Sequence, residues 1–565
     1  MFMLQASLYA LWAIPLLLAQ QSASVSAIVR YDWNVTPYNA VFDGVPVAAY
    51  GINDGPAHKA VINVTLGDEV EVHLTNLLDN ATCLHWHGLK ELGTQDMDGV
   101  SGLTQCYIEP NMTAVYRFTP DKAGTFWWHS HESTQYTFGL CGPLIVHNHP
   151  DELQPWEQDV DEEITVQLAD WYHFLPGSPP HWDTILIDYK GQYNCTAAEM
   201  QNLACSEVQP YARFNFSAGK KYRLRLVNEG ALAPLLFSID NHEFRVIAAD
   251  GEAMQPSELV NTLFINVGQR YDIIVETKES NQLYYDEENV EHPLGSFWMR
   301  ATGLHDKPWT GFDEDDITDG FNANGLAIID YAGTTASEPT TESWKTIAMV
   351  NEFDFTPMSP SKLPEQPDDR VILEFNMTTG SDPLGWFSIN GGDYNNFEIP
   401  DEPPLLSIAA GENTKQLPAT ANAYKLDYGK HIEVVLVNDM NEQHPFHLHS
   451  HTPWVVGSGT ASRGEITSGN LSRPLRLDGP MLRDVYTVPP CDTDDDGDCK
   501  DLGYLVLRLN ADSPGVWILH CHIDWHLVDG LAMMFVEGEE LLQERGVQAF
   551  SSTMLSVCKR DQIDV

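Results

Sequence analysis

Residues 514–526 read Pro514-Gly515-Val516-Trp517-Ile518-Leu519-His520-Cys521-His522-Ile523-Asp524-Trp525-His526. Three imidazoles and a thiol this close together indicate a metal site. Because successive side chains of a strand face opposite ways, Cys521 should point to one side and His520 and His522 to the other. Cys521 and His526 can then share a copper in the trigonal blue-copper geometry, and the flanking histidines are left for a second centre. The alternative is a buried free cysteine among unrelated histidines.

Short alternating apolar runs separated by Gly, Pro and Asn recur along the chain, and no long stretch has the helical period. This pattern predicts an all-β protein. Two motifs each occur three times along the chain. A ten-residue motif runs from a glycine to an asparagine at Gly67–Asn76, Gly219–Asn228 and Gly429–Asn438. An eight-residue motif follows at Gly124–His131, Gly295–Thr302 and Gly515–His522. We therefore expect three consecutive β domains built on one plan.

The spacing of these repeats places the domains at residues 28–150, 151–338 and 339–565. Residues 1–27 are predicted to be a signal peptide, because an apolar run is followed by small residues, although no basic residue precedes the run. No later stretch approaches the roughly 20 apolar residues of a membrane span. We expect a secreted, extracellular glycoprotein. Asn-X-Ser/Thr sequons suit export and occur at Asn34, Asn63, Asn80, Asn111, Asn194, Asn215, Asn376 and Asn470.

The chain has 565 residues and a net charge of −50. Such a surface repels nucleic acid and anionic membranes, so neither is expected as a partner. Cationic or neutral ligands are favoured, and a monomer is expected.

Nine cysteines are present, and eight remain if Cys521 binds metal. An even number suits disulfides in an extracellular protein. Cys195 with Cys205 and Cys491 with Cys499 are close enough to pair locally. The sequence alone does not pair the others, which are Cys83, Cys106, Cys141 and Cys558. The acidic run 492–498 resembles the first half of a calcium loop but has glycine at the twelfth position, which favours a solvated hairpin.

Four His-X-His pairs stand at His85/His87, His129/His131, His447/His449 and His520/His522. Each pair shares one face of a strand. One pair is often merely a surface feature, but four pairs matched between the first and third domains indicate a metal cluster. Three metals with two or three histidines each fit eight imidazoles, and imidazole suits copper. The cluster should lie between these two domains. The middle domain should hold no metal, because its corresponding positions are Phe237, Ile239, Arg300 and Thr302.

His444, three residues before the third-domain pair, completes a separate site with Cys521 and His526. The corresponding first-domain residues are Thr82, Ser130 and Gln135. Only the third domain can therefore hold a thiolate copper. The backbone joins Cys521 directly to His520 and His522, which gives electrons a short path to the cluster.

Together, the motifs at residues 85–88, 129–131, 444–449 and 520–531 resemble those of multicopper oxidases of the three-domain type, and are most similar to fungal laccases and related ferroxidases. The resemblance implies cupredoxin-like Greek-key β-barrel or sandwich domains and four copper ions. The implied type 1 ligands are His444, Cys521 and His526, and the type 2 ligands are His85 and His447. The implied type 3 ligands are His87, His129 and His522 for one copper and His131, His449 and His520 for the other.

Leu531 stands where this family often has methionine, which implies a three-coordinate, more oxidising type 1 copper. Met533 and Met534 are expected in the core. Asp98 and Asp524 match acidic positions that can relay protons to reduced dioxygen. The alternative role for both carboxylates is ordinary turn and strand-edge hydrogen bonding.

The resemblance implies one-electron oxidation of phenols or aromatic amines, coupled to four-electron reduction of dioxygen to water. The alternative is a ferroxidase, which oxidises ferrous iron. A copper-binding protein without turnover is disfavoured, because an electron carrier needs one site and has no use for eight paired histidines.

Asp183, within the segment 179–187, falls where laccases carry an acidic residue that faces the substrate. A carboxylate that takes the proton of an oxidised phenol lowers the barrier; the alternative role is a turn or helix cap. Related ferroxidases carry an additional glutamate where this chain has residues 177–179, Gly-Ser-Pro. This absence favours a laccase. Iron ligands could instead come from Asp478, Asp484 or the loop 492–498.

Overall fold

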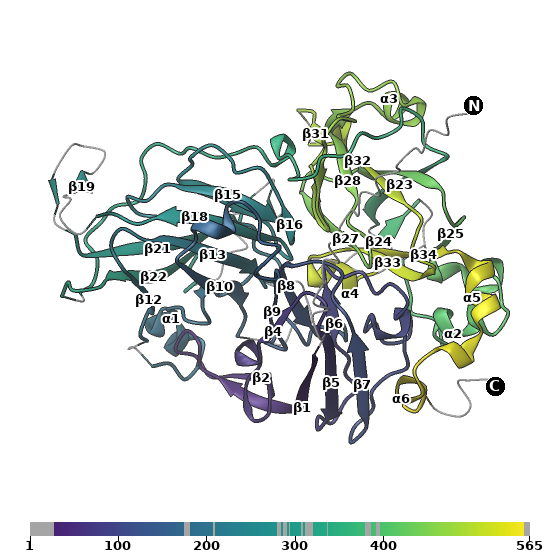
Figure 1. Ribbon diagram of the computed structural model, residues 1–565, viewed down its shortest axis with the longest axis horizontal. Helices are drawn as coiled ribbons and strands as arrows, with labels where there is room; N and C mark the ends of the chain where they lie inside the picture. The colour runs from purple at the N-terminus through teal and green to yellow at the C-terminus, as the bar shows by residue number, and fades with distance from the viewer. Residues whose placement is uncertain are drawn as a thin grey trace, which may run out of the picture.

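The computed structural model describes residues 27–173, 181–206, 209–279, 284–285, 291–292, 294–306, 309–310, 320–335, 337–378, 386–390, 396–495 and 497–558. The predicted signal peptide, apart from its last residue, lies outside this set, and so do residues 177–179. Figure 1 shows three lobes, coloured purple to blue, teal, and green to yellow in chain order.

The first lobe contains two sheets. One has the order β3 (Gly55–Pro56), β2 (Val47–Ile52), β1 (Ile28–Ala40), β5 (Glu69–Asn76), β7 (Thr113–Phe118). The other has the order β4 (Ile62–Thr65), β9 (Cys141–His147), β8 (Gly124–His129), β6 (His85–His87).

The second lobe repeats this architecture. One sheet has the order β11 (Thr184–Ile187), β10 (Glu162–Trp171), β13 (Lys221–Asn228), β18 (Arg270–Glu276), β15 (Phe244–Ala249), β16 (Glu252–Ala253). The other has the order β12 (Ala212–Phe216), β22 (Asn324–Tyr331), β21 (Ser296–Gly303), β14 (Leu235–Ile239), β17 (Thr262–Ile265). A separate pair joins β19 (Tyr284–Tyr285) to β20 (Glu291–His292).

The third lobe has one sheet in the order β24 (Trp386–Ile389), β23 (Asp369–Thr378), β26 (His431–Asn438), β32 (Cys499–Asn510), β28 (Trp454–Ala461), β29 (Met481–Leu482). Its other sheet has the order β25 (Ala423–Leu426), β34 (Ala532–Glu537), β33 (Gly515–Cys521), β27 (His444–Leu448), β30 (Val485–Val488). The predicted acidic hairpin is confirmed, because β31 (Asp492–Thr493) pairs antiparallel with β32.

Helices are short and lie between strands or after the last strand, β34. The α-helices are α1 (Cys195–Met200), α2 (Pro404–Ala409), α3 (Arg463–Ser468), α4 (Asp524–Val528), α5 (Glu539–Arg545) and α6 (Ser552–Leu555). The 3₁₀ helices are η1 (Ala57–Lys59), η2 (Gln95–Met97), η3 (Glu157–Asp159), η5 (Glu352–Asp354), η6 (Thr414–Gln416), η7 (Ala419–Ala421) and η8 (Val547–Ala549). Among the described residues, no helix is long and apolar enough to cross a membrane.

The same central strand pairings recur in all three lobes, which confirms the prediction of an all-β fold with an internal repeat. In each lobe the ten-residue motif forms a strand that pairs parallel with the first strand of that lobe, as β5 with β1, β13 with β10 and β26 with β23. The eight-residue motif forms β8, β21 and β33, each paired antiparallel with the next strand. The lobes fall within the predicted domain ranges, whose exact ends stay a prediction.

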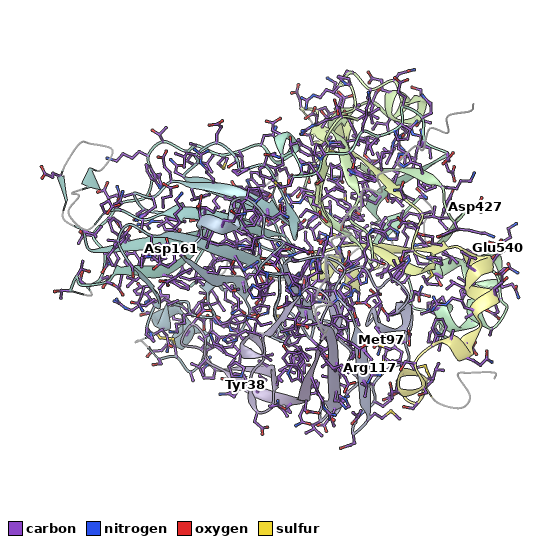
Figure 2. The ribbon with its side chains drawn as sticks, in the orientation of Figure 1. Tyr38, Met97, Arg117, Asp161, Asp427 and Glu540 are labelled. Atoms are coloured by element: carbon purple, nitrogen blue, oxygen red, sulfur yellow. A yellow bond between two sulfur atoms is a disulfide. The ribbon has the colours of Figure 1, made fainter. Side chains whose placement is uncertain are left out.

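Apolar packing joins the third lobe to both others. Val516 and Ile518 of β33 belong to the same buried cluster as Trp86 and Trp128 of the first lobe. Leu519, on the opposite face of β33, belongs to a cluster that continues into the second lobe. The strand that carries Cys521 is therefore held from both sides. The acidic surface lies outside these cores: Asp427 and Glu540 are exposed, at the right-hand edge of the molecule in Figure 2.

Within the described residues, three disulfides form. The two predicted local pairs, Cys195–Cys205 and Cys491–Cys499, are present, and a third joins Cys106 to Cys558. Cys83 and Cys141 are buried free thiols, so the even count does not extend to a fourth disulfide. The third disulfide ties the segment after α6 to the first lobe.

Removal of the Cys106–Cys558 disulfide, by replacing both cysteines with serine, should lower the free energy of unfolding by about 5 kcal/mol, because the closed loop is long. The sequence separation is 452 residues, against ten for Cys195–Cys205. The matched double-serine variant of Cys195 and Cys205 should lose about 3 kcal/mol or less. Urea unfolding of both variants measures the difference, and equal losses would contradict the expectation.

Candidate metal centres

The four histidine pairs are aligned by strand pairing. His85 of β6 lies opposite His129 of β8, and His447 of β27 lies opposite His520 of β33. Directly opposed residues in antiparallel strands have side chains within contact distance. Each outer lobe therefore presents four imidazoles from two adjacent strands and the residues that follow them.

The two groups of four meet where the first and third lobes join, near β6, β8, β33 and α4 in Figure 1. His85 stacks on His449 with ring centroids 3.8 Å apart, and His87 stacks on His447 at 3.9 Å. Seven of the eight are buried, and His131 is partly buried. The structure thus brings together eight histidines that the sequence separates by up to 437 residues, from His85 to His522.

The nitrogen positions fit metal binding. His449 Nε2 lies 3.3 Å from His520 Nε2, and His87 Nδ1 lies 3.3 Å from His522 Nε2. Two nitrogens each about 2 Å from one ion would be separated by this distance. His131, His449 and His520 present nitrogens that all lie within 4.8 Å of one another. These three form one of the two predicted type 3 sets.

Unsatisfied nitrogens also fit a metal. Five buried nitrogens of the cluster histidines have no hydrogen-bond partner among the described residues, namely Nε2 of His85, His129, His131 and His447 and Nδ1 of His522. Burial holds the pKa values of His129, His131 and His447 well below the ordinary value. These imidazoles are therefore neutral, with lone pairs available, as metal ligands must be.

The predicted thiolate set also comes together. Cys521 Sγ lies 3.7 Å from His444 Nδ1 and 3.5 Å from His526 Nδ1, and the two nitrogens are 3.1 Å apart. Burial lowers the pKa of His526 to about 3. One thiol and two neutral imidazoles therefore face a common point, as a trigonal copper site requires.

Apolar side chains surround this second site. The ring of Phe387 lies 4.4 Å from that of His526, and Phe375 lies 5.2 Å from His444. Leu531 is fully buried, and its carbonyl accepts a hydrogen bond from the backbone N–H of Cys521. The prediction that Met533 and Met534 belong to the core is confirmed, since both are buried in apolar clusters.

The first lobe has a hydrogen-bonded group at the corresponding place. Thr82 and Ser130 both donate to Gln135 Oε1, at 2.7 and 2.8 Å. Gln135 Nε2 in turn donates to the carbonyl of Ala81. These side chains satisfy one another and leave no soft ligand for copper.

In the middle lobe, the residue that corresponds to His129 and His520 is Arg300, which forms an ion pair instead. Arg300 forms two 2.8 Å hydrogen bonds to the carboxylate of Asp240. No group of three potential metal ligands occurs within the described part of this lobe.

Asp98 lies between the two halves of the cluster. Its carboxylate oxygens are 3.0 and 3.1 Å from His449 Nδ1, and its carbonyl accepts from His85 Nδ1 at 2.7 Å. The turn that brings Asp98 here needs glycine next, because a Cβ on Gly99 would lie 1.7 Å from the carbonyl oxygen of Leu84. Asp98 therefore orients two cluster histidines. Its proton-relay role stays a prediction.

Asp524 borders a cavity of about 390 Å³ that reaches the cluster. His129, His131, His520 and His522 line the same cavity. The carboxylate accepts a 2.5 Å hydrogen bond from Thr137, and burial raises its pKa to about 7. The cavity gives small molecules a route to the histidines, and Asp524 is placed beside it.

Asp183 is not joined to the thiolate site by any hydrogen bond seen in the described structure. Its carboxylate accepts from the backbone N–H of His173 at 2.9 Å and lies 3.6 Å from His173 Nδ1. Asp183 therefore connects the two ends of the segment between β10 and β11, through its contacts with His173. A role toward a substrate stays a prediction.

The expectation that Asp484 could serve as an iron ligand is wrong. Its carboxylate is buried, forms two 2.6 Å hydrogen bonds with Arg270, and lies 3.2 Å from His87 Nε2. Sequence reasoning missed this contact with the cluster, because no spacing rule connects Asp484 to residues so far away in the chain.

Family models also match this chain, and they agree with the two copper sites that the histidine and cysteine geometry indicates. Family models described as multicopper oxidase match residues 34–151, 162–334 and 367–540. The chain belongs to the multicopper oxidase family. Copper is therefore its cofactor, and dioxygen with reductants such as phenols or ferrous iron are the partners of such enzymes.

Relatives of this multicopper oxidase fall into both predicted activity classes. It is 31% identical to Laccase-2 of Cryptococcus neoformans var. grubii, over 91% of this chain and 85% of that protein. It is 30% identical to the iron transport multicopper oxidase fetC of Epichloe festucae, over 96% and 81%. Among solved structures, Fet3p, a multicopper oxidase that functions in iron import, superposes with a TM-score of 0.78 at 25% identity, covering 95% of both chains.

Proposed function

We propose that this multicopper oxidase is a secreted laccase with four coppers per chain. One copper would be held by His444, Cys521 and His526, and three by the eight cluster histidines. When bound, copper supplies one-electron oxidation of the reductant and the four-electron reduction of dioxygen to water. The chain's own residues set which donors approach and where protons are held.

The apolar surroundings of His526 are the observation that favours a laccase over a ferroxidase. As a whole residue His526 is partly exposed, whereas His444 is fully buried, so a donor can approach His526 more closely than His444. The ring packs on Phe387, and Val528, two residues further on, is 49% exposed. An aromatic donor can contact such an apolar edge without the loss of hydration that a metal ion would suffer there.

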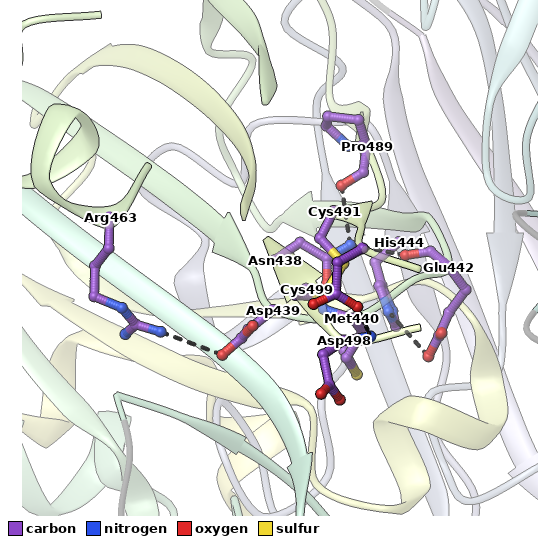
Figure 3. The surroundings of a disulfide bond; sticks show 11 residues. Asn438, Asp439, Met440, Glu442, His444, Arg463, Pro489, Cys491, Asp498 and Cys499 are labelled. Atoms are coloured by element: carbon purple, nitrogen blue, oxygen red, sulfur yellow. Dashed lines mark hydrogen bonds and ion pairs between the residues drawn. A yellow bond between two sulfur atoms is a disulfide. The ribbon is translucent and has the colours of Figure 1, made fainter. Parts of the chain in front are cut away.

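One observation favours a ferroxidase as the second candidate. Glu442 Oε1 lies 3.7 Å from His444 Nε2, beside the Cys491–Cys499 disulfide in Figure 3. Asp439 is nearby but pairs with Arg463. A carboxylate beside a copper ligand could attract ferrous iron. However, the Glu442 side chain is only 10% exposed, which limits access for a hydrated cation.

Steady-state oxidation of a phenol and of ferrous ion, measured side by side with oxygen uptake, tests the proposal. A laccase should turn over the phenol with the higher kcat/KM, and Glu442→Gln should leave that value unchanged. A much higher kcat/KM for ferrous ion, reduced by Glu442→Gln, would replace the laccase proposal with ferroxidase.

Asp183→Asn tests the predicted proton acceptor. If Asp183 takes the phenol proton, the variant should lower kcat/KM for phenols by about 100-fold. A one-electron donor that releases no proton should be oxidised at the parent rate, and this donor is the internal control. If Asp183 only connects the ends of this segment through His173, the variant should lower kcat/KM for both donors equally. That result would contradict a catalytic role for Asp183.

A further inference from the structure

A groove of about 590 Å³ lies on the third lobe. Its walls come from β23 and β32, from the segment 365–368 before β23, and from the end of α3 with the residues that follow it. These elements lie in the upper part of the third lobe in Figure 1, above β33 and α4, which carry copper ligands. The candidate copper ligands are not among its lining residues, so the groove is separate from the oxidase site.

One of the eight predicted sequons opens onto this groove. Asn470, which begins Asn470-Leu471-Ser472, is exposed and lines it. Gly469 places it there by ending α3 in the left-handed conformation, with φ +74°. A Cβ at Gly469 would lie 2.9 Å from Arg370 Nη1, so the close approach of this turn to the groove wall depends on the glycine.

The side-chain amide of Asn470 is available for modification. It makes no hydrogen bond within the part of the chain that the structure describes. Two other sequons differ in this respect, because Asn194 Oδ1 accepts from the backbone N–H of Thr196 at 3.0 Å and Asn376 Oδ1 accepts from Ser388 Oγ at 2.9 Å. An N-linked glycan is attached to the amide nitrogen, so a glycan on Asn470 would begin at the groove without breaking a contact.

The polar lining suits a neutral ligand rich in hydroxyl groups. Arg370 and Arg508 both pair with the buried carboxylate of Glu433, at 2.8 and 2.6 Å. The other acidic lining residues are exposed, namely Glu365, Asp368 and Asp369. Four carboxylates against two guanidinium groups repel an anion. Sugar hydroxyls, in contrast, can donate to carboxylates and accept from guanidinium N–H groups.

The groove also has an apolar part. Leu471 and Leu475 are half-buried and pack against the apolar cluster that contains Val506, and all three line the groove. The C–H face of a sugar ring can cover such partly exposed groups and remove them from water. A metal ion would not be stabilised by them, so this part of the lining favours a saccharide over a cation.

We propose that the groove is the docking site of an N-linked glycan on Asn470, and that the first two N-acetylglucosamine residues lie in it. The volume of about 590 Å³ is within the range of pockets that hold small organic ligands, roughly 300–1,000 Å³. Because the glycan is tethered at the groove, its local concentration is high and weak contacts hold it in place. The inference rests on the proposed export, since sequons are modified in secreted proteins.

The test uses the full-length protein expressed in a fungal host, with glycopeptide mass spectrometry to identify the occupied sequons. Endoglycosidase H, which cuts between the first two N-acetylglucosamines, is then applied to the native protein. Release from Asn470 should be about 10-fold or more slower than from Asn80, because the cut site must first leave the groove. Asn80 is the matched control, since it is exposed in a loop after β5. After denaturation, both glycans should be released at the same rate.

Ser468→Trp should fill the groove while keeping the sequon intact. Ser468 is exposed on the last turn of α3 and lines the groove, so a large side chain there should displace the glycan. Release from Asn470 should then be as fast as from Asn80. Thr467→Trp is the matched control, because Thr467 is exposed on the same helix but is not a lining residue, and protection should persist. An unchanged blue colour in both variants verifies that they fold.

The outcomes separate this inference from the proposed export. Glycans at other sequons with a bare Asn470 would overturn the docking site alone. Equal release from native Asn470 and Asn80 would also overturn it, and so would a Ser468→Trp variant that stays as protected as the parent. A protein that remains inside the cells without any glycan would refute the proposed export together with this inference.

Discussion

Cys521→Ser should yield a colourless protein without oxidase turnover. The thiol sulfur is the soft ligand that distinguishes this site from the imidazole cluster, and a serine hydroxyl does not replace it. Cys521 is also the residue that joins the site to His520 and His522 through one peptide bond on each side. The substitution therefore removes both the blue copper and the shortest electron path.

Copper analysis, visible spectra and oxygen uptake measure this result. Three of the four coppers should remain, because no cluster histidine is altered. Cys141→Ser is the matched control, since Cys141 is a buried free thiol that contacts Tyr189 at 2.9 Å. That variant should stay blue. A Cys521→Ser protein that is still blue would disprove the assignment of the thiolate site.

Asp98→Asn should slow the reaction with dioxygen by about 100-fold or more, with little effect on reduction of the blue copper. Asp98 touches His449 and His85, on the cluster side of the structure. An asparagine there neither holds a transferable proton nor accepts from His449 as an anion. The blue site on the opposite face of β33 should not sense the change.

Rapid mixing separates the two half-reactions. Anaerobic bleaching of the blue colour follows reduction, and its return on mixing with dioxygen follows reoxidation. Asp96→Asn is the control, because Asp96 is a buried carboxylate two residues away that accepts from the backbone N–H of Ser551. Equal slowing of both half-reactions in Asp98→Asn would refute the proton-relay role. Asp98 would then have only a structural role.

The sequence contains enough information for the strands and for the candidate ligand sets. His520, Cys521 and His522 lie in consecutive positions, so the alternation of a strand alone assigns their faces. The repeat then relates His85 and His129 to His447 and His520. These inferences need only the alternation of side chains along a strand and the spacing of the internal repeat.

Contacts between lobes could not be predicted in the same way. Cys106 and Cys558 form a disulfide, and Arg270 meets Asp484, across hundreds of residues with no local signal. The prediction that Asp484 could bind iron is wrong for this reason. Its acidic character was visible in the sequence, but its burial depends on the packing of all three lobes.

The Cys106–Cys558 disulfide also sets an order of events during biosynthesis. A nascent chain grows at about 5–20 residues per second and folds from its N-terminal domain onward. With 452 residues between the two cysteines, Cys106 must wait on the order of a minute for its partner to be synthesised. During that interval the first lobe carries four histidines and half of a cluster. Closure of this last covalent link therefore marks a chain in which every copper ligand has already been translated.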